Sequence, residues 1–99
     1  MMSFIRIITT KTLTLKQEKE VTLSLQNILK NYHNEANFMI QIEDNQVMYL
    51  NAQEIECIRL EIFIRENYSQ YLKKEIMNTI KMITDIPTSH QSIELFVMS

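Results

Sequence analysis

The side chains of this sequence that could carry chemistry are few and isolated from one another. Cys57 is the single cysteine, so it cannot form a disulfide within the chain. An isolated thiol in an alternating apolar strand is more often part of a core than a nucleophile. His33 and His90 lie in predicted loops, and neither has a histidine four residues away, so a metal site would need two further ligands from elsewhere. We therefore expect no metal site.

Glutamates and glycine-rich loops are the other features that could supply catalysis or bind a cofactor. Glu54, Glu56 and Glu61 could suggest paired carboxylates, yet Glu56 and Glu61 point to opposite faces of a predicted strand. We interpret these side chains as solvated or paired across strands. The chain contains no glycine, which excludes the glycine-dependent loops that bind nucleotide phosphates. No cofactor is expected.

Length, charge and hydropathy limit the class of protein. The 99 residues fit one domain, residues 1–99. The net charge is −2 and the basic residues are scattered, which argues against a nucleic-acid partner. The N-terminus lacks a signal-peptide pattern, and no apolar run approaches the roughly 18 residues of a membrane span. We expect a cytoplasmic protein without a membrane partner.

The first half of the chain reads as strand, helix and strand. Residues 3–9 are short, β-branched and mostly apolar, which is typical of a buried strand. Thr14-Leu15-Lys16-Gln17 matches a capping box, so a helix should begin there and run to about Asn31. Residues 38–43 have strand composition, and 47–50 could pair as a short edge strand after a polar turn.

The second half repeats this order. Residues 57–64 alternate between apolar and charged side chains and give the most secure strand. A cap at residues 67–70 predicts a second helix that ends near Thr84, before the lone proline, Pro87. Residues 92–98 predict a last strand.

The two halves resemble each other, which narrows the fold. Ile5-Arg6-Ile7 recurs 53 residues later as Ile58-Arg59-Leu60. Each βαβ unit should have parallel strands joined by a right-handed crossover. The predicted fold class is therefore α+β, a tandem βαβ repeat (βαββαβ) with a four-stranded sheet and two helices on one face. No element remains to cover the other face, which predicts packing against another subunit.

Four segments in this order carry a resemblance to a known family. Residues 2–7 form an apolar strand, Thr14 to Gln17 open the first helix, Asp44 to Met48 form a turn after the second strand, and Arg65-Glu66 follow the third long strand. Together they resemble the tautomerase superfamily, which contains 4-oxalocrotonate tautomerase, macrophage migration inhibitory factor and uncharacterised bacterial relatives. The family begins Met-Pro before its apolar strand, and residues 2–7 lie in that register. The resemblance implies a homotrimer, or a hexamer for shorter members, with a small carboxylate or enol/keto ligand between subunits.

The resemblance also implies a catalytic group that this chain lacks. Family members use an N-terminal proline amine as a base for keto-enol proton transfer, because an amine with a pKa near neutral can accept a proton. Ser3 occupies that position here, preceded by Met1 and Met2. If translation began at Met2, processing could expose the Ser3 amine, whose reference pKa is about 7.7 to 8.0.

Other positions matched to family active-site residues are Leu13, Asn34, Ile93 and Leu95, and none keeps the family's chemistry. Arg65, just after the third long strand, is the cation in a plausible place for substrate binding. Lys11, in the loop before the first helix, could reach the mouth of the same ligand pocket. We predict a tautomerase-like protein with little or no isomerase activity. Two alternatives remain open: a non-catalytic oligomeric binding or structural module, and a ferredoxin-like regulatory domain with antiparallel strand order.

Overall fold

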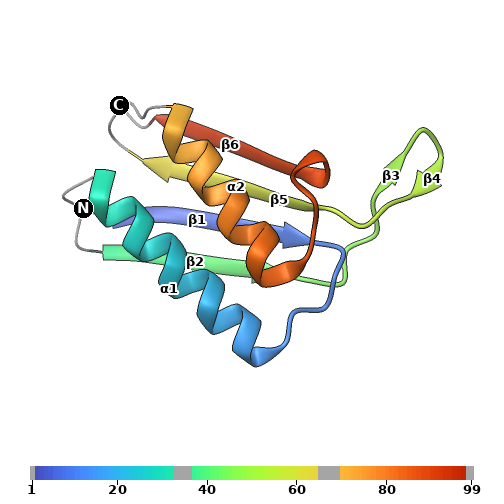
Figure 1. The fold of residues 1–99 in the computed structure, drawn as a ribbon, viewed down its shortest axis with the longest axis horizontal. Coiled ribbons are helices and arrows are strands. Elements are labelled where there is room, and N and C mark those ends of the chain that lie inside the picture. Colours follow the sequence, from blue (N-terminus) through green and yellow to red (C-terminus); the bar gives the residue numbers. More distant parts are fainter. Residues whose placement is uncertain (1, 33–36, 65–69, 98–99) are drawn as a thin grey trace.

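The protein, shown here as a computed structural model, is a sheet with both long helices on one face (Figure 1). The structure describes residues 2–32, 37–64 and 70–97. In chain order the elements are β1 (Met2–Thr9), α1 (Leu15–Tyr32), β2 (Asn37–Glu43), β3 (Tyr49–Leu50), β4 (Gln53–Glu54), β5 (Ile58–Ile64), α2 (Gln70–Thr84), the 3-10 turn η1 (Thr88–His90) and β6 (Gln91–Val97).

The sheet has the predicted tandem βαβ arrangement. Its strand order is β2-β1-β5-β6. β1 runs parallel to β2, β5 runs parallel to β6, and the two halves meet where β1 and β5 pair in antiparallel fashion. The parallel pairs differ from the antiparallel order of the ferredoxin-like alternative. The predicted fold class, with both helices on one face, is confirmed.

Both helices form because local capping and an apolar stripe agree. Before α1, the backbone N–H of Gln17 donates to Thr14 Oγ1 at 3.1 Å, and the Thr14 N–H donates to Gln17 Oε1 at 3.0 Å. These are the two bonds of the predicted capping box. α2 ends at Thr84 as predicted, and the next residue, Asp85, has a φ of 63° and donates its N–H to the Lys81 carbonyl at 2.9 Å. The predicted cap of α2 at residues 67–69 lies outside the described residues.

The core fills the space between the helices and one face of the sheet. Side chains of β5 alternate between buried and half-buried along the whole strand, so every second residue of the strand faces the helices. The helices contribute residues at three- and four-residue spacing. The core cluster consists of Ile5, Ile7, Val21, Leu25, Ile28, Leu29, Ile58, Leu60, Ile62, Ile64, Leu72, Ile76, Ile80, Ile86 and Ile93.

Of the short strand predicted at residues 47–50, only Tyr49 and Leu50 form a strand, and this strand does not join the edge of the main sheet. Tyr49 and Leu50 pair with Glu54 and Gln53 in a separate two-stranded hairpin. Asn51 and Ala52 both have positive φ, 52° and 65°, the combination that a two-residue type I′ turn requires. The hairpin stands away from the main sheet (Figure 1), because the tight turn pairs β3 with β4 rather than with a strand of the main sheet.

Candidate functional site

Ser3, at the position of the family proline, is enclosed in the sheet. It is the second residue of β1, lies opposite Phe38 of β2 in the parallel register, and is 0% exposed. Buried residues alternate along β1 at Ser3, Ile5 and Ile7, so the Ser3 side chain lies on the face that the helices cover. With Met2 before it in the strand, the Ser3 nitrogen belongs to a peptide bond and cannot accept a proton as an amine would.

Arg65 lies outside the described residues, but the strand that leads to it is described. β5 ends at Ile64, and its neighbour Phe63 lies opposite Phe4 of β1. The carboxyl end of β5 therefore meets the amino end of β1, where Ser3 lies.

Lys11 lies at the other end of the sheet from Ser3. It follows the carboxyl end of β1, where Thr9 lies opposite Ile58 at the start of β5. The six residues from Ser3 to Thr9 span about 20 Å of extended strand. Because β1 and β5 are antiparallel, their carboxyl ends lie at opposite ends of the sheet. The expectation that Lys11 and Arg65 share one mouth involves Arg65, which lies outside the described residues.

The ammonium group of Lys11 has a structural partner. Its Nζ donates to the main-chain carbonyl of Thr84 at 2.6 Å, at the carboxyl end of α2. Gln17 Nε2 donates to the neighbouring carbonyl of Ile83 at 3.2 Å. The last carbonyls of a helix have no partner within the helix, and a cation at this end interacts favourably with the helix dipole. Lys11 therefore ties the loop after β1 to the end of α2.

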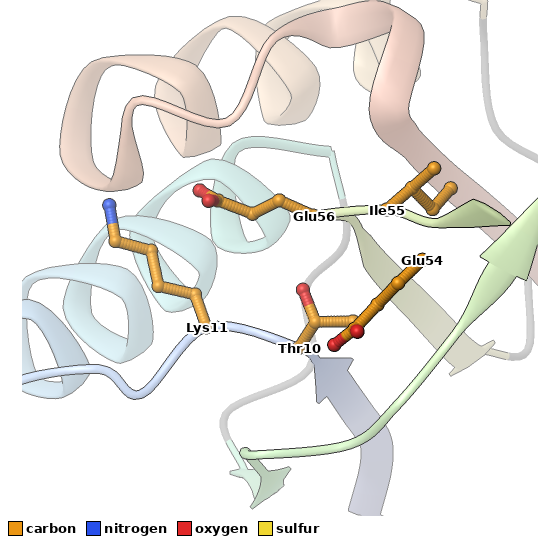
Figure 2. Close-up of a pocket in the computed structure, with 5 residues that line it drawn as sticks. All are labelled: Thr10, Lys11, Glu54, Ile55 and Glu56. Atoms are coloured by element: carbon orange, nitrogen blue, oxygen red, sulfur yellow. The ribbon is translucent and has the colours of Figure 1, made fainter.

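A cavity of about 350 Å³ beside Lys11 is lined by Thr10, Lys11, Glu54, Ile55 and Glu56. In Figure 2 the Glu56 carboxylate extends toward the Lys11 ammonium group, and the Glu54 side chain extends toward Thr10. Two carboxylates and a lysine already engaged by a carbonyl make a poor site for an anion. This cavity therefore does not match the carboxylate ligand that the family resemblance implies.

We predict that Lys11→Met destabilises the fold by about 1 kcal/mol, because the Thr84 carbonyl loses a charged donor and the helix end loses a cation. The matched control is Lys16→Met. Lys16 is exposed, and its Nζ lies as far as 3.9 Å from Glu20 Oε1. Exposed ion pairs of this kind contribute little to the stability of the fold. Urea unfolding of both variants measures the difference. Equal effects of the two substitutions would contradict the capping role of Lys11.

The open face of the sheet carries a connected row of charges that runs across all four strands. We call this row the charge ladder; its members, from edge to edge, are Glu43, Arg6, Glu61, Arg59 and Glu94. Arg6 lies 3.1 Å from Glu43 and 3.4 Å from Glu61, and Arg59 lies 3.1 Å from both Glu61 and Glu94. Hydrogen bonding to Glu43 and the charge of that carboxylate raise the pKa of Arg6. Every charge of the ladder thus has an opposite charge beside it.

The internal repeat of the sequence explains the geometry of the charge ladder. Arg6 lies opposite Gln41 and binds Glu43, two residues further along β2. Arg59 lies opposite Ser92 and binds Glu94, two residues further along β6. Glu61 is shared at the junction of the halves. The sequence allowed Glu61 to pair across strands, but it did not identify the ladder, because the partners become neighbours only through the strand register.

We predict that Glu61→Gln lowers the melting temperature by several degrees and further than Glu94→Gln does. Glu61 accepts from both arginines, so its neutralisation leaves Arg6 and Arg59 without their shared anion, whereas Glu94 contacts Arg59 alone. Thermal unfolding at low salt and in about 1 M NaCl measures both variants, and the gap should narrow at high salt because salt screens charges. The same shift for both variants at low salt would contradict a shared role of Glu61.

Beside the charge ladder, one end of the open face is apolar. We call this patch the aromatic row; it comprises Phe4, Phe63, Phe96 and the neighbouring Met39. The rings of Phe63 and Phe96 stack with centroids 4.8 Å apart, and Phe4 lies 6.0 Å from Phe63. Met39 lies opposite Phe4 on β2 and is exposed. The aromatic row belongs to the Ser3 end of the sheet, and it supports the predicted contact with another subunit.

Other chemistry-bearing residues do not gather into a site within the described ranges. Burial raises the pKa of the Cys57 thiol, which keeps it protonated near neutral pH, and its Sγ lies 3.0 Å from Met48 Sδ. Residues 2–32, 37–64 and 70–97 contain no group of three or more His, Cys, Asp or Glu residues that could hold a metal ion. Within those ranges, neither helix has the length and apolar character needed to cross a membrane. His33 lies outside the described residues.

Comparison with known proteins supports the fold rather than a named activity. No protein-family model matches the sequence, and no curated protein does. Solved structures match it with TM-scores near 0.8. The macrophage migration inhibitory factor-like protein of Entamoeba histolytica matches with a TM-score of 0.84 and 12% identity, over 98% of this chain and 89% of that one.

Two further structures give the same result. A fused 4-oxalocrotonate tautomerase, described as a wild-type symmetric trimer, matches with a TM-score of 0.81 and 13% identity, over 97% of this chain and 87% of that one. Pt0534, in a form inactivated by 2-oxo-3-pentynoate, matches with a TM-score of 0.80 and 12% identity, over 96% of this chain and 85% of that one. This chain therefore has the fold of the tautomerase and macrophage migration inhibitory factor superfamily, as the sequence resemblance predicted.

Proposed function

We propose that this chain is a non-catalytic, homotrimeric member of the tautomerase superfamily that acts as a binding or structural module. It has little or no keto-enol isomerase activity. The observation that carries the proposal is the position of Ser3, which is buried in β1 and linked through its nitrogen to Met2. Proton transfer of the family type needs an accessible amine of suitable pKa, and an amide nitrogen within a strand is not one.

The other positions matched to family active-site residues support the same conclusion. Leu13 and Ile93 are buried in the apolar interior, and Leu95 packs against the core, so these side chains stabilise the fold. Asn34 lies outside the described residues. Arg65 is the cation that we assign to a small carboxylate or enol/keto ligand between subunits, since it follows the strand that ends beside β1. Lys11 receives no such assignment because it binds the end of α2.

The open sheet face is the surface that we assign to trimer formation. Its aromatic row would be removed from water by a second copy of the chain, which stabilises association. Its charge ladder can be covered without leaving an unpaired charge, because each member already has an ionic partner. The symmetric trimer of the fused 4-oxalocrotonate tautomerase supports three copies rather than two.

The experiment compares phenylpyruvate enol-to-keto conversion by two proteins, with intact mass recorded on each sample. The first is the native chain. The second is a Ser3→Pro variant expressed from Met2, so that removal of the initiating methionine exposes a proline amine. We expect no conversion above the buffer rate for the native chain and measurable conversion for the variant.

Covalent labelling gives a readout that does not depend on turnover. 2-Oxo-3-pentynoate, which inactivates Pt0534, should add its mass to the Ser3→Pro variant faster than to the native chain, because an alkynyl ketone adds to a neutral amine and lysine amines are protonated near neutral pH. Phenylpyruvate conversion by the native chain that is abolished when its N-terminal amine is blocked would overturn the proposal and identify an isomerase with an unusual base. Native mass spectrometry tests the trimer, which would have a mass of about 35 kDa from subunits of 11.8 kDa.

A further inference from the structure

The β3–β4 hairpin leaves a run of apolar side chains in contact with water. Val47, Tyr49 and Leu50 are each more than half exposed, and the hairpin stands away from the main sheet (Figure 1). Its strands have two residues each, and a two-stranded hairpin is at best marginally stable alone in water. Consecutive exposed apolar residues are unfavourable unless they serve a contact with another molecule.

A second cavity lies between this hairpin and the open face of the sheet. Its volume is about 510 Å³. Met48, Tyr49 and Leu50 line it from the hairpin, and Arg59 and Ser92 line it from β5 and β6. We call the cavity bounded by these residues the hairpin groove. Because Arg59 belongs to the charge ladder, the hairpin groove opens on the face that we assign to the trimer.

The hairpin groove and the aromatic row lie at different ends of this face. Phe63, whose ring lies beside both other rings of the aromatic row, follows Arg59 by four residues, or about 13 Å of strand. In a closed ring of three copies, each subunit contacts its two neighbours through two different surfaces. The aromatic row can be only one of them, so the proposed trimer needs a second surface that complements it.

We propose that the hairpin groove of each subunit receives the aromatic row of the next subunit around the ring. This inference rests on the proposed trimer and identifies the two surfaces that meet in it. Contact would remove both apolar surfaces from water. The ring of Tyr49 can pack against phenylalanine rings, and the thioether of Met48 is favourable beside an aromatic ring. Arg59 can be covered without leaving an unpaired charge, because it already binds Glu61 and Glu94.

Leu50→Glu tests the hairpin groove, with Leu23→Glu on α1 as the matched control. Both leucines are more than half exposed, so neither substitution should prevent folding, which circular dichroism checks. Leu50→Glu should lower the mass in solution from about 35 kDa to 11.8 kDa, because the contact would bury a carboxylate that has no free cation beside it. Leu23→Glu should remain a trimer. Size exclusion coupled to light scattering measures both masses.

The result for the native chain separates failure of this inference from failure of the trimer. A folded Leu50→Glu protein that keeps the mass of a native trimer would overturn the inference and leave the trimer intact. A native chain that is monomeric in the same measurement would refute the trimer, and the inference with it.

Mixing two variants shows whether the two surfaces meet. Phe96→Glu keeps its hairpin groove and Leu50→Glu keeps its aromatic row, so one intact contact can form between them. Nitrogen-15 NMR of labelled Phe96→Glu should show shifts of the Tyr49 and Leu50 amides when unlabelled Leu50→Glu is added to about 1 mM, which reveals even millimolar affinity. Unlabelled Phe96→Glu should cause no such shifts. Absence of shifts with Leu50→Glu, or equal shifts with both proteins, would overturn the inference.

Discussion

Replacing Phe63 with glutamate should convert the proposed trimer into a monomer and lower its mass in solution from about 35 kDa to 11.8 kDa. Phe63 is the centre of the aromatic row, between Phe4 and Phe96. A carboxylate at this position could be buried only at a large desolvation cost, because no cation of the charge ladder is free to pair with it. Association would therefore become unfavourable. Light scattering coupled to size exclusion measures the mass.

Two further variants separate loss of association from loss of folding. Phe96→Glu changes the same row on edge strand β6, where the side chain is 39% exposed, so the monomer should tolerate it. Tyr71→Glu introduces the same charge on α2, at a side chain that is 76% exposed and lies on the opposite layer. Phe96→Glu should also give a monomer with native circular dichroism, and Tyr71→Glu should remain a trimer. A Phe96→Glu protein that keeps its full mass would exclude the aromatic row as the contact.

Replacing Leu25 with alanine should destabilise the fold by about 2–5 kcal/mol, because it removes a fully buried side chain and leaves a cavity. Leu25 is 0% exposed and contacts the core from α1. A small domain has a total stability of roughly 5–15 kcal/mol, so this loss would be a large fraction of it. Urea unfolding, followed by circular dichroism at constant protein concentration, measures the change in the free energy of unfolding.

Leu23 provides a control with the same chemistry on the same helix. It lies two residues earlier and is 61% exposed, because a two-residue step turns the helix by about 200°. Leu23→Ala should change the free energy of unfolding by no more than about 0.5 kcal/mol. Comparable losses for Leu23→Ala and Leu25→Ala would mean that the apolar stripe does not face the sheet as the structure places it.

The local structure and the fold class were predictable because the relevant signals are local or periodic. The Thr14–Gln17 capping box forms both of its hydrogen bonds, since all of its atoms lie within one turn of chain. The second helix was predicted to end near Thr84, and α2 does end there, since the proline that stops it lies only three residues further on. The repeat around Arg6 and Arg59 predicted two βαβ units, since sequence repetition produces repetition of structure.

Features that depend on residues distant in sequence were decided only by the tertiary structure. The sequence did not show that Lys11 would bind the end of α2, 73 residues later, at the opposite end of the sheet from Ser3. It also did not show that Glu43, Glu61 and Glu94 would converge on two arginines. Those contacts depend on strand direction and register, which a one-residue slip would change completely. That a serine, Ser3, follows Met2 was visible in the sequence, whereas the burial of Ser3 required the packed sheet.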